Sequence, residues 1–190
     1  KPTINRTFSK EETMASPFVQ ELIVDNFDNA ISAECKDEDY KKSFLLPILQ
    51  KTYSVLRERF LVNVGGRYEI ILSVSPEINN ADYSSWVKNS TYDVSIIKAF
   101  LKLYAKYLRA DGKDEAEVMQ ILENMPQEPI GEEGYWLAQD MPLSESHRHM
   151  SHCMPIFPLQ MLDFLNVDDK RIMENTLQYK GYFTNISFSV

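Results

Sequence analysis

All three histidines of the chain lie within six positions, in the segment Glu145-Ser146-His147-Arg148-His149-Met150-Ser151-His152-Cys153. Three interpretations fit these residue types. The segment can be a capped helix start with polar packing. It can be a metal site, because imidazole nitrogens and a thiolate are ligands that zinc prefers, although the sequence has no second dense group of such ligands. It can also bind a polyhydroxylated ligand, with Arg148 and the imidazoles donating hydrogen bonds to hydroxyl oxygens.

Two further features could take part in chemistry. Ser75-Pro76-Glu77 ends a β-rich stretch, and a glutamate that aromatic neighbours desolvate acquires a raised pKa and can serve as a general acid. Surface turns use the same three residue types. Tyr135-Trp136 lies in a loop rich in glycine and proline, where an indole can form the floor of a sugar subsite or pack into the core.

The elements that must position these residues are predicted to be mostly helices, from apolar residues at helical spacing. We expect helices over 14–33, 43–61, 92–110, 154–165 and 168–179, with a shorter one around 118–122. Pro47 fits the first turn of the second helix, and Gly65-Gly66 should end it. Residues 67–73 should form a short strand or an extended stretch, and the loop 126–146 is long enough to be functional. With about six helices and no βαβ alternation, the fold class is mainly α.

The apolar spacing also predicts which side chains face inward. The clearest amphipathic pattern is that of residues 92–110, with Thr91 or Asp93 as the expected N-cap. The inward residues expected there are Val94, Ile97, Leu101, Tyr104 and Leu108. Those expected in the 43–61 helix are Phe44, Ile48, Tyr53, Leu56 and Phe60.

Composition limits the classes of function. The chain has 190 residues, 44% of them apolar, and a formal net charge of −8. It can bury a sizeable core, and it lacks the basic character of a nucleic-acid-binding protein. No apolar run approaches the ~20 residues of a membrane span, so neither nucleic acid nor membrane insertion is expected. The chain begins at Lys1-Pro2 without an initiator methionine, which predicts a processed product or a fragment.

Four features, taken in order along the chain, resemble glycoside hydrolase family 95, which contains α-L-fucosidases and α-L-galactosidases. They are Ser75-Pro76-Glu77, Thr91-x-Asp93 at a helix start, a loop rich in glycine and proline with a tryptophan, and Glu-Ser-His-Arg-His-x-Ser-His at 145–152. The last of these is the specific part. The order and approximate spacing agree from about residue 44 to about residue 180.

The resemblance implies that residues 1–190 are a single partial catalytic domain, part of an (α/α)6 toroid with a short β element. It also implies an inverting, exo-acting hydrolase of terminal α-linked sugars such as L-fucose or L-galactose. In this family, asparagines of an upstream motif, helped by a downstream aspartate, activate the water, and neither segment occurs in this chain. We therefore expect almost no turnover by the chain alone, and the rest of the barrel becomes a possible partner.

The resemblance also assigns roles to individual residues. Glu77 corresponds to the general acid, and His147, Arg148, His149 and Trp136 to the sugar-binding subsite. The implied substrate is an oligosaccharide or polysaccharide. The implied location is the bacterial periplasm or the extracellular space. No cofactor and no metal is implied, because carboxylate chemistry needs none.

Two alternatives from other classes remain open. The chain can be a non-catalytic carbohydrate-binding or helical interaction module that kept the subsite and lost the water-activating groups. It can also be a metal-binding α-helical domain that uses His147, His149 and His152. The catalytic interpretation makes a geometric prediction. Glu77 and the segment 147–149, about 70 positions apart, should line one cleft, because an acid and its sugar-binding residues must share a pocket.

Overall fold

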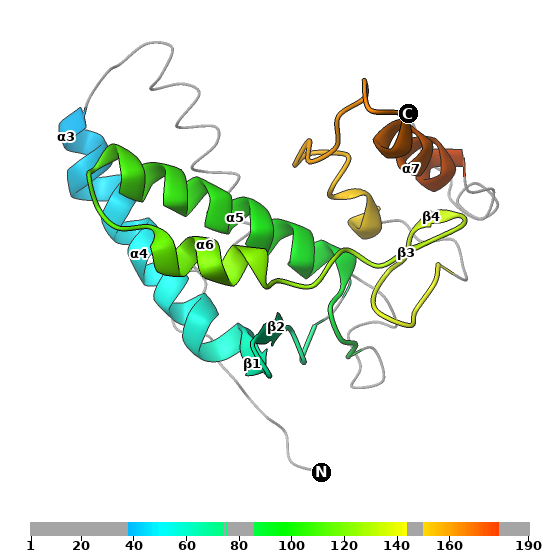
Figure 1. Cartoon of the computed structure of the whole chain (residues 1–190), viewed down its shortest axis with the longest axis horizontal. Helices are drawn as coiled ribbons and strands as arrows, with labels where there is room; N and C mark the ends of the chain where they lie inside the picture. The colour runs from blue at the N-terminus through cyan, green and yellow to red at the C-terminus, as the bar shows by residue number, and fades with distance from the viewer. Residues whose placement is uncertain (1–37, 74, 76–85, 144–149, 179–190) are drawn as a thin grey trace, which may run out of the picture.

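The computed structural model describes residues 38–73, 75, 86–143 and 150–178. This part of the chain is mainly helical, as predicted (Figure 1). The helical elements are α3 (Glu38–Tyr40), the π-helical turn η1 (Lys41–Leu45), α4 (Leu46–Val55), the π-helical turn η2 (Leu56–Phe60), α5 (Thr91–Ala110), α6 (Ala116–Glu123), the 3₁₀ turn η5 (Ser151–Cys153) and α7 (Val167–Gln178). The strands are β1 (Val62–Val64), β2 (Arg67–Glu69), β3 (Ile130–Gly131) and β4 (Gly134–Tyr135). The predicted helix over 14–33 lies outside the described residues.

The predicted helix over 43–61 is present as one helical run from α3 to η2. Pro47 lies in the first turn of α4, as expected, and η1 continues the run upstream through a bond from the Leu46 N–H to the Lys41 carbonyl. Each π turn adds a residue to its turn and rotates the inward face. Phe44 and Phe60 are therefore 49% and 41% exposed, and their prediction as inward residues was wrong.

Gly65 and Gly66 form a hairpin turn and do not end the helix, which stops at Phe60. Strands β1 and β2 pair antiparallel, with Val62 opposite Glu69 and Val64 opposite Arg67. Both glycines have positive φ, 62° and 93°, as a two-residue turn between paired strands requires. The sequence prediction placed only the second of these strands.

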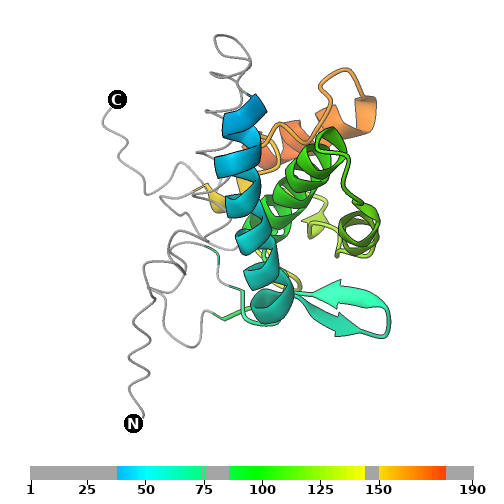
Figure 2. The same cartoon turned by 90° about the vertical axis from the view of Figure 1, so that its left-hand side faces the viewer.

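Helices α4, α5 and α6 lie side by side, with α5 in contact with both of the others (Figures 1 and 2). All five residues predicted to face inward from α5 are buried: Val94, Ile97, Leu101, Tyr104 and Leu108. They share one core with Leu45, Leu49 and Leu56 of the first helical run and with Val118 and Ile121 of α6. This is why the strong amphipathic pattern of α5 predicted its bounds correctly.

Residues 68–70 and the N-terminal end of α5 lie at one end of this three-helix bundle. The Tyr68 N–H donates to the Asn124 carbonyl at 2.9 Å, and the Asn89 N–H donates to the Ile70 carbonyl at 3.0 Å. The C-terminal ends of α4 and α6 and the N-terminal end of α5 therefore lie together. The chain leaves this end of the bundle after α4 and again after α6.

The second part of the chain packs against this end and along α5. The β3–β4 hairpin contacts α7, and η5 contacts α5. Helix α7 agrees with the prediction for 168–179. The predicted helix over 154–165 is absent, because Pro155 and Pro158 provide no N–H for a helical ladder and the chain there forms turns. The expected loop 126–146 contains the small β3–β4 hairpin.

None of the helices among the described residues combines the length and the apolar composition that crossing a bilayer requires.

Candidate active site

The first turn of α5 holds Ser73, which lies two residues before Ser75. Ser90 is the N-cap, and its hydroxyl accepts from the Asp93 N–H, so the N-cap prediction of Thr91 or Asp93 was wrong by one to three positions. The buried Ser73 hydroxyl lies 2.6 Å from the Ser90 hydroxyl and 2.5 Å from Asp93 Oδ2. It also accepts from the Ser90 N–H. Asp93 of the Thr-x-Asp pattern thus holds the chain at Ser73, two residues before Ser75.

Ser75 contacts Ser151 across 76 positions of sequence. The two hydroxyl oxygens are 2.5 Å apart, and the side chains are only 2% and 5% exposed. Ser75 is the first residue of the Ser-Pro-Glu pattern, and Ser151 belongs to the His-Arg-His-x-Ser-His pattern. One buried contact therefore joins the two patterns that the sequence singled out for chemistry.

Glu77, His147, Arg148 and His149 lie outside the described residues. Glu77 follows Ser75 by two positions, and His149 precedes Ser151 by two. That both segments line one cleft stays a prediction.

The Ser75–Ser151 contact predicts a coupling free energy. Replacing either serine by alanine leaves the other hydroxyl buried without its partner, which costs about 1–3 kcal/mol of unfolding free energy. The double variant Ser75→Ala/Ser151→Ala should lose less unfolding free energy than the two single variants lose together. Urea unfolding measures all three, and Ser54→Ala, at an exposed serine of α4, is the control that should change little. Strictly additive losses would show that the two segments are not coupled through this contact.

The third histidine and the neighbouring thiol are part of the packing against α5. His152 is 1% exposed and Cys153 is 6% exposed, and their Nε2 and Sγ atoms are 3.4 Å apart. Among the described residues, no group of three histidines, cysteines or carboxylates could hold a metal ion. Because His147 and His149 lie outside this part, the metal alternative stays a prediction.

Burial should make Cys153 unreactive in the folded protein. Desolvation raises the pKa of this thiol to about 12, and only the thiolate reacts with alkylating reagents. In a Cys35→Ser variant we expect Cys153 to react with iodoacetamide at pH 8 about 10³-fold more slowly than a free thiol. Mass spectrometry of timed samples measures this rate, with the same variant unfolded in urea as the control. Equal rates in the folded and unfolded protein would contradict the buried position.

Trp136 is held by the β3–β4 hairpin and by α5. Its backbone N–H donates to the Pro129 carbonyl at 2.9 Å, and its carbonyl accepts from the Thr91 hydroxyl at 2.6 Å. A side chain at position 131 would collide with the indole nitrogen, so glycine is required there. Gly134, with φ 101°, lets the hairpin approach Thr176 of α7 in the same way. The half-buried indole lines a groove of about 780 Å³ between β2, the segment after α6 and residues 136–140.

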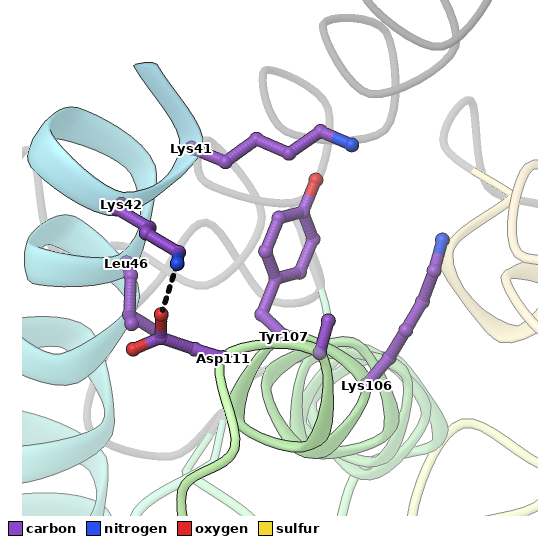
Figure 3. A pocket seen from close by; sticks show the side chains of 7 residues that line it. Lys41, Lys42, Leu46, Lys106, Tyr107 and Asp111 are labelled. Carbon is purple, nitrogen blue, oxygen red and sulfur yellow. Dashed lines mark ion pairs between the residues drawn. The ribbon is translucent and has the colours of Figure 1, made fainter. Parts of the chain in front are cut away.

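A smaller cavity of about 100 Å³ lies between η1 and the C-terminal end of α5. Figure 3 shows Lys41, Lys106 and the Tyr107 ring beside it, with Lys42 reaching Asp111 at 3.5 Å. A hydrogen bond from Lys113 lowers the pKa of Asp111. Helix α5 has 20 residues and is therefore about 30 Å long. The cavity therefore lies far from Ser90 and from Ser73, which contacts Ser90.

Nearly the whole chain matches a known protein family. The family model described as the glycosyl hydrolase family 95 catalytic domain matches residues 7–187. A search of curated proteins gives no match.

Proposed function

Because the chain belongs to glycosyl hydrolase family 95, we propose that it cleaves terminal α-linked sugars such as L-fucose or L-galactose with inversion at the anomeric carbon. The family match covers nearly the whole chain and supports glycoside hydrolysis as the general activity. The match extends across all the sequence patterns that carry the proposed roles.

The proposed mechanism uses Glu77 as the general acid. Its protonated carboxyl group delivers a proton to the glycosidic oxygen as the bond to the anomeric carbon breaks. Arg148 and His149, with His147, donate hydrogen bonds to the hydroxyl groups of the terminal sugar and hold it in position. Trp136 contributes apolar surface to sugar binding. A water molecule attacks the anomeric carbon from the opposite face, and no residue of this chain is assigned to its activation.

The observation that carries this proposal is the buried contact between the Ser75 and Ser151 hydroxyls. Without it, the acid pattern and the sugar-binding pattern would be two unrelated sequence features. With it, Glu77 follows one member of the pair by two positions in the sequence, and His149 precedes the other by two. The anchoring of Ser73 by Ser90 and Asp93 supports the proposal further, because a general acid needs a fixed backbone to reach the glycosidic oxygen.

We propose that the described helices are part of an (α/α)6 toroid, with the catalytic centre at the end where α5 begins. Such a toroid is built from repeated antiparallel helix pairs, and α5 pairs with its neighbours in this way. The groups that activate water in this family come from other segments of the domain. For that reason the test uses the protein as its complete reading frame encodes it.

The deciding experiment follows the hydrolysis of aryl α-L-fucosides and α-L-galactosides by proton NMR. An inverting enzyme releases the β anomer of the sugar first, and mutarotation then produces the α anomer. Initial release of the α anomer would rule out inversion. Failure to hydrolyse any terminal α-linked sugar would favour the carbohydrate-binding alternative.

A further inference from the structure

The groove beside Trp136 has the size and chemistry of a ligand site. Its volume of about 780 Å³ lies within the usual range for small-ligand pockets. Three separate segments form its walls: β2 with Arg67, the segment 123–130 after α6, and residues 136–140. Apart from Trp136, these residues have no part in the proposed bond cleavage.

Hydrogen bonds and one ion pair fix these walls to each other. Asn89 accepts from the Ile70 N–H at 2.8 Å and donates its amide to Gln139 Oε1 at 2.9 Å. The Gln139 N–H donates to the Lys88 carbonyl at 3.1 Å. On the other side, Lys98 and Glu128 form a nearly buried pair at 2.8 Å. A groove with walls fixed in this way needs little reorganisation to bind a ligand.

The lining offers an aromatic surface together with exposed amide groups. Trp136 Nε1 and Glu128 Oε1 are buried and have no hydrogen-bond partner among the described residues. The indole nitrogen is packed against Gly131, so the surface that the groove can offer a ligand is mainly ring carbon. Exposed amides of Gln127 and Gln139 line the same groove. An aromatic ring flanked by amides and carboxylates suits a saccharide, whose CH faces stack on rings while its hydroxyls both donate and accept.

Charge excludes anionic ligands. Lys88 neutralises Glu69 at 2.7 Å and Lys98 neutralises Glu128. The remaining charged side chains of the lining are the acidic Glu123 and Asp140 and the basic Arg67. A carboxylated or sulfated sugar would therefore meet a net negative lining.

We propose that this groove binds a neutral saccharide part of the substrate, away from the bond that is cleaved. The identity of the ligand rests on the proposed hydrolase function. The groove is linked to Ser73, two residues before the Ser-Pro-Glu pattern, because the Trp136 carbonyl accepts a hydrogen bond from the Thr91 hydroxyl and the adjacent Ser90 is hydrogen-bonded to Ser73. An extended glycan would gain contacts in the groove that a small glycoside lacks, so we expect a higher kcat/KM for the glycan.

The test compares two substrates of the complete protein: a neutral oligosaccharide that ends in the cleaved α-linked sugar, and the aryl glycoside of the same sugar. Gln127→Trp fills the groove from an exposed position without removing a packed side chain. It should lower kcat/KM for the oligosaccharide by about 10-fold or more and leave the aryl glycoside within about twofold. Gln127→Ala leaves the groove open and is the matched control, which should retain most of the activity on both substrates.

Equal losses on the two substrates, or no loss on either, would overturn the proposal for the groove. A wild-type protein that cleaves neither substrate counts against the proposed function instead. In that case calorimetric titration with the neutral oligosaccharide decides the question of the groove. Binding that Gln127→Trp weakens supports the groove, and absent or unchanged binding overturns it.

Discussion

Glu77→Gln should lower the turnover of a natural α-linked saccharide by about 10²–10⁴-fold, the usual contribution of general acid catalysis. The amide keeps the shape of the side chain but has no proton to give to the leaving oxygen. An activated aryl glycoside, whose leaving group departs without protonation, should lose far less. The sugar should still bind, because Arg148 and His149 are unchanged.

The measurement is kcat/KM for both substrate classes on the wild type and the variant, in the complete protein. Glu117→Gln is a suitable control, because Glu117 is an exposed carboxylate of α6 in an ion pair with Arg57 and has no proposed part in bond cleavage or in the groove. If Glu77→Gln reduced both substrates equally, Glu77 would have a structural role. If it left both nearly unchanged, Glu77 would not take part in the mechanism and would be an ordinary turn residue.

The sequence predicted the parts of the fold that local pattern determines. Helix α5 was found with bounds within one residue because its apolar positions recur regularly and Ser90 caps it. The two π turns were not foreseen, because a π turn depends on how a helix meets its neighbours, and this moved Phe44 and Phe60 out of the core. The false helix over 154–165 came from apolar spacing that outweighed two prolines. There the prolines were the better signal.

The candidate site could be predicted only in part, for a different reason. Its residue types are visible in the sequence, but the contacts that assemble it join residues far apart. Nothing local to Ser75 indicates that its hydroxyl meets Ser151. Serines are too common to suggest a pairing, and loop closure over such a distance leaves no periodic pattern. The groove was missed for the same reason, since its walls come from three segments.

Lys98→Met should strongly destabilise the folded protein. Lys98 projects from α5 to Glu128, with the two side chains 10% and 11% exposed. Without the ammonium group, the Glu128 carboxylate stays buried with no charge to balance it. Breaking one half of a buried pair costs about 3–5 kcal/mol. The matched control is Arg57→Met, which breaks the pair with Glu117, where both side chains are 55% exposed, and should cost no more than about 1 kcal/mol.

The double variant Lys98→Met/Glu128→Met separates the loss of attraction from the cost of a stranded charge. Burying two ions carries a large desolvation cost, so an apolar pair of similar volume should bring the unfolding free energy back to within about 1 kcal/mol of the wild type. Urea unfolding of the four proteins measures this. If Lys98→Met cost no more than Arg57→Met, the pair would be solvated in solution. Because Glu128 belongs to the segment whose Pro129 carbonyl holds Trp136, that result would also remove one fixed wall from the groove.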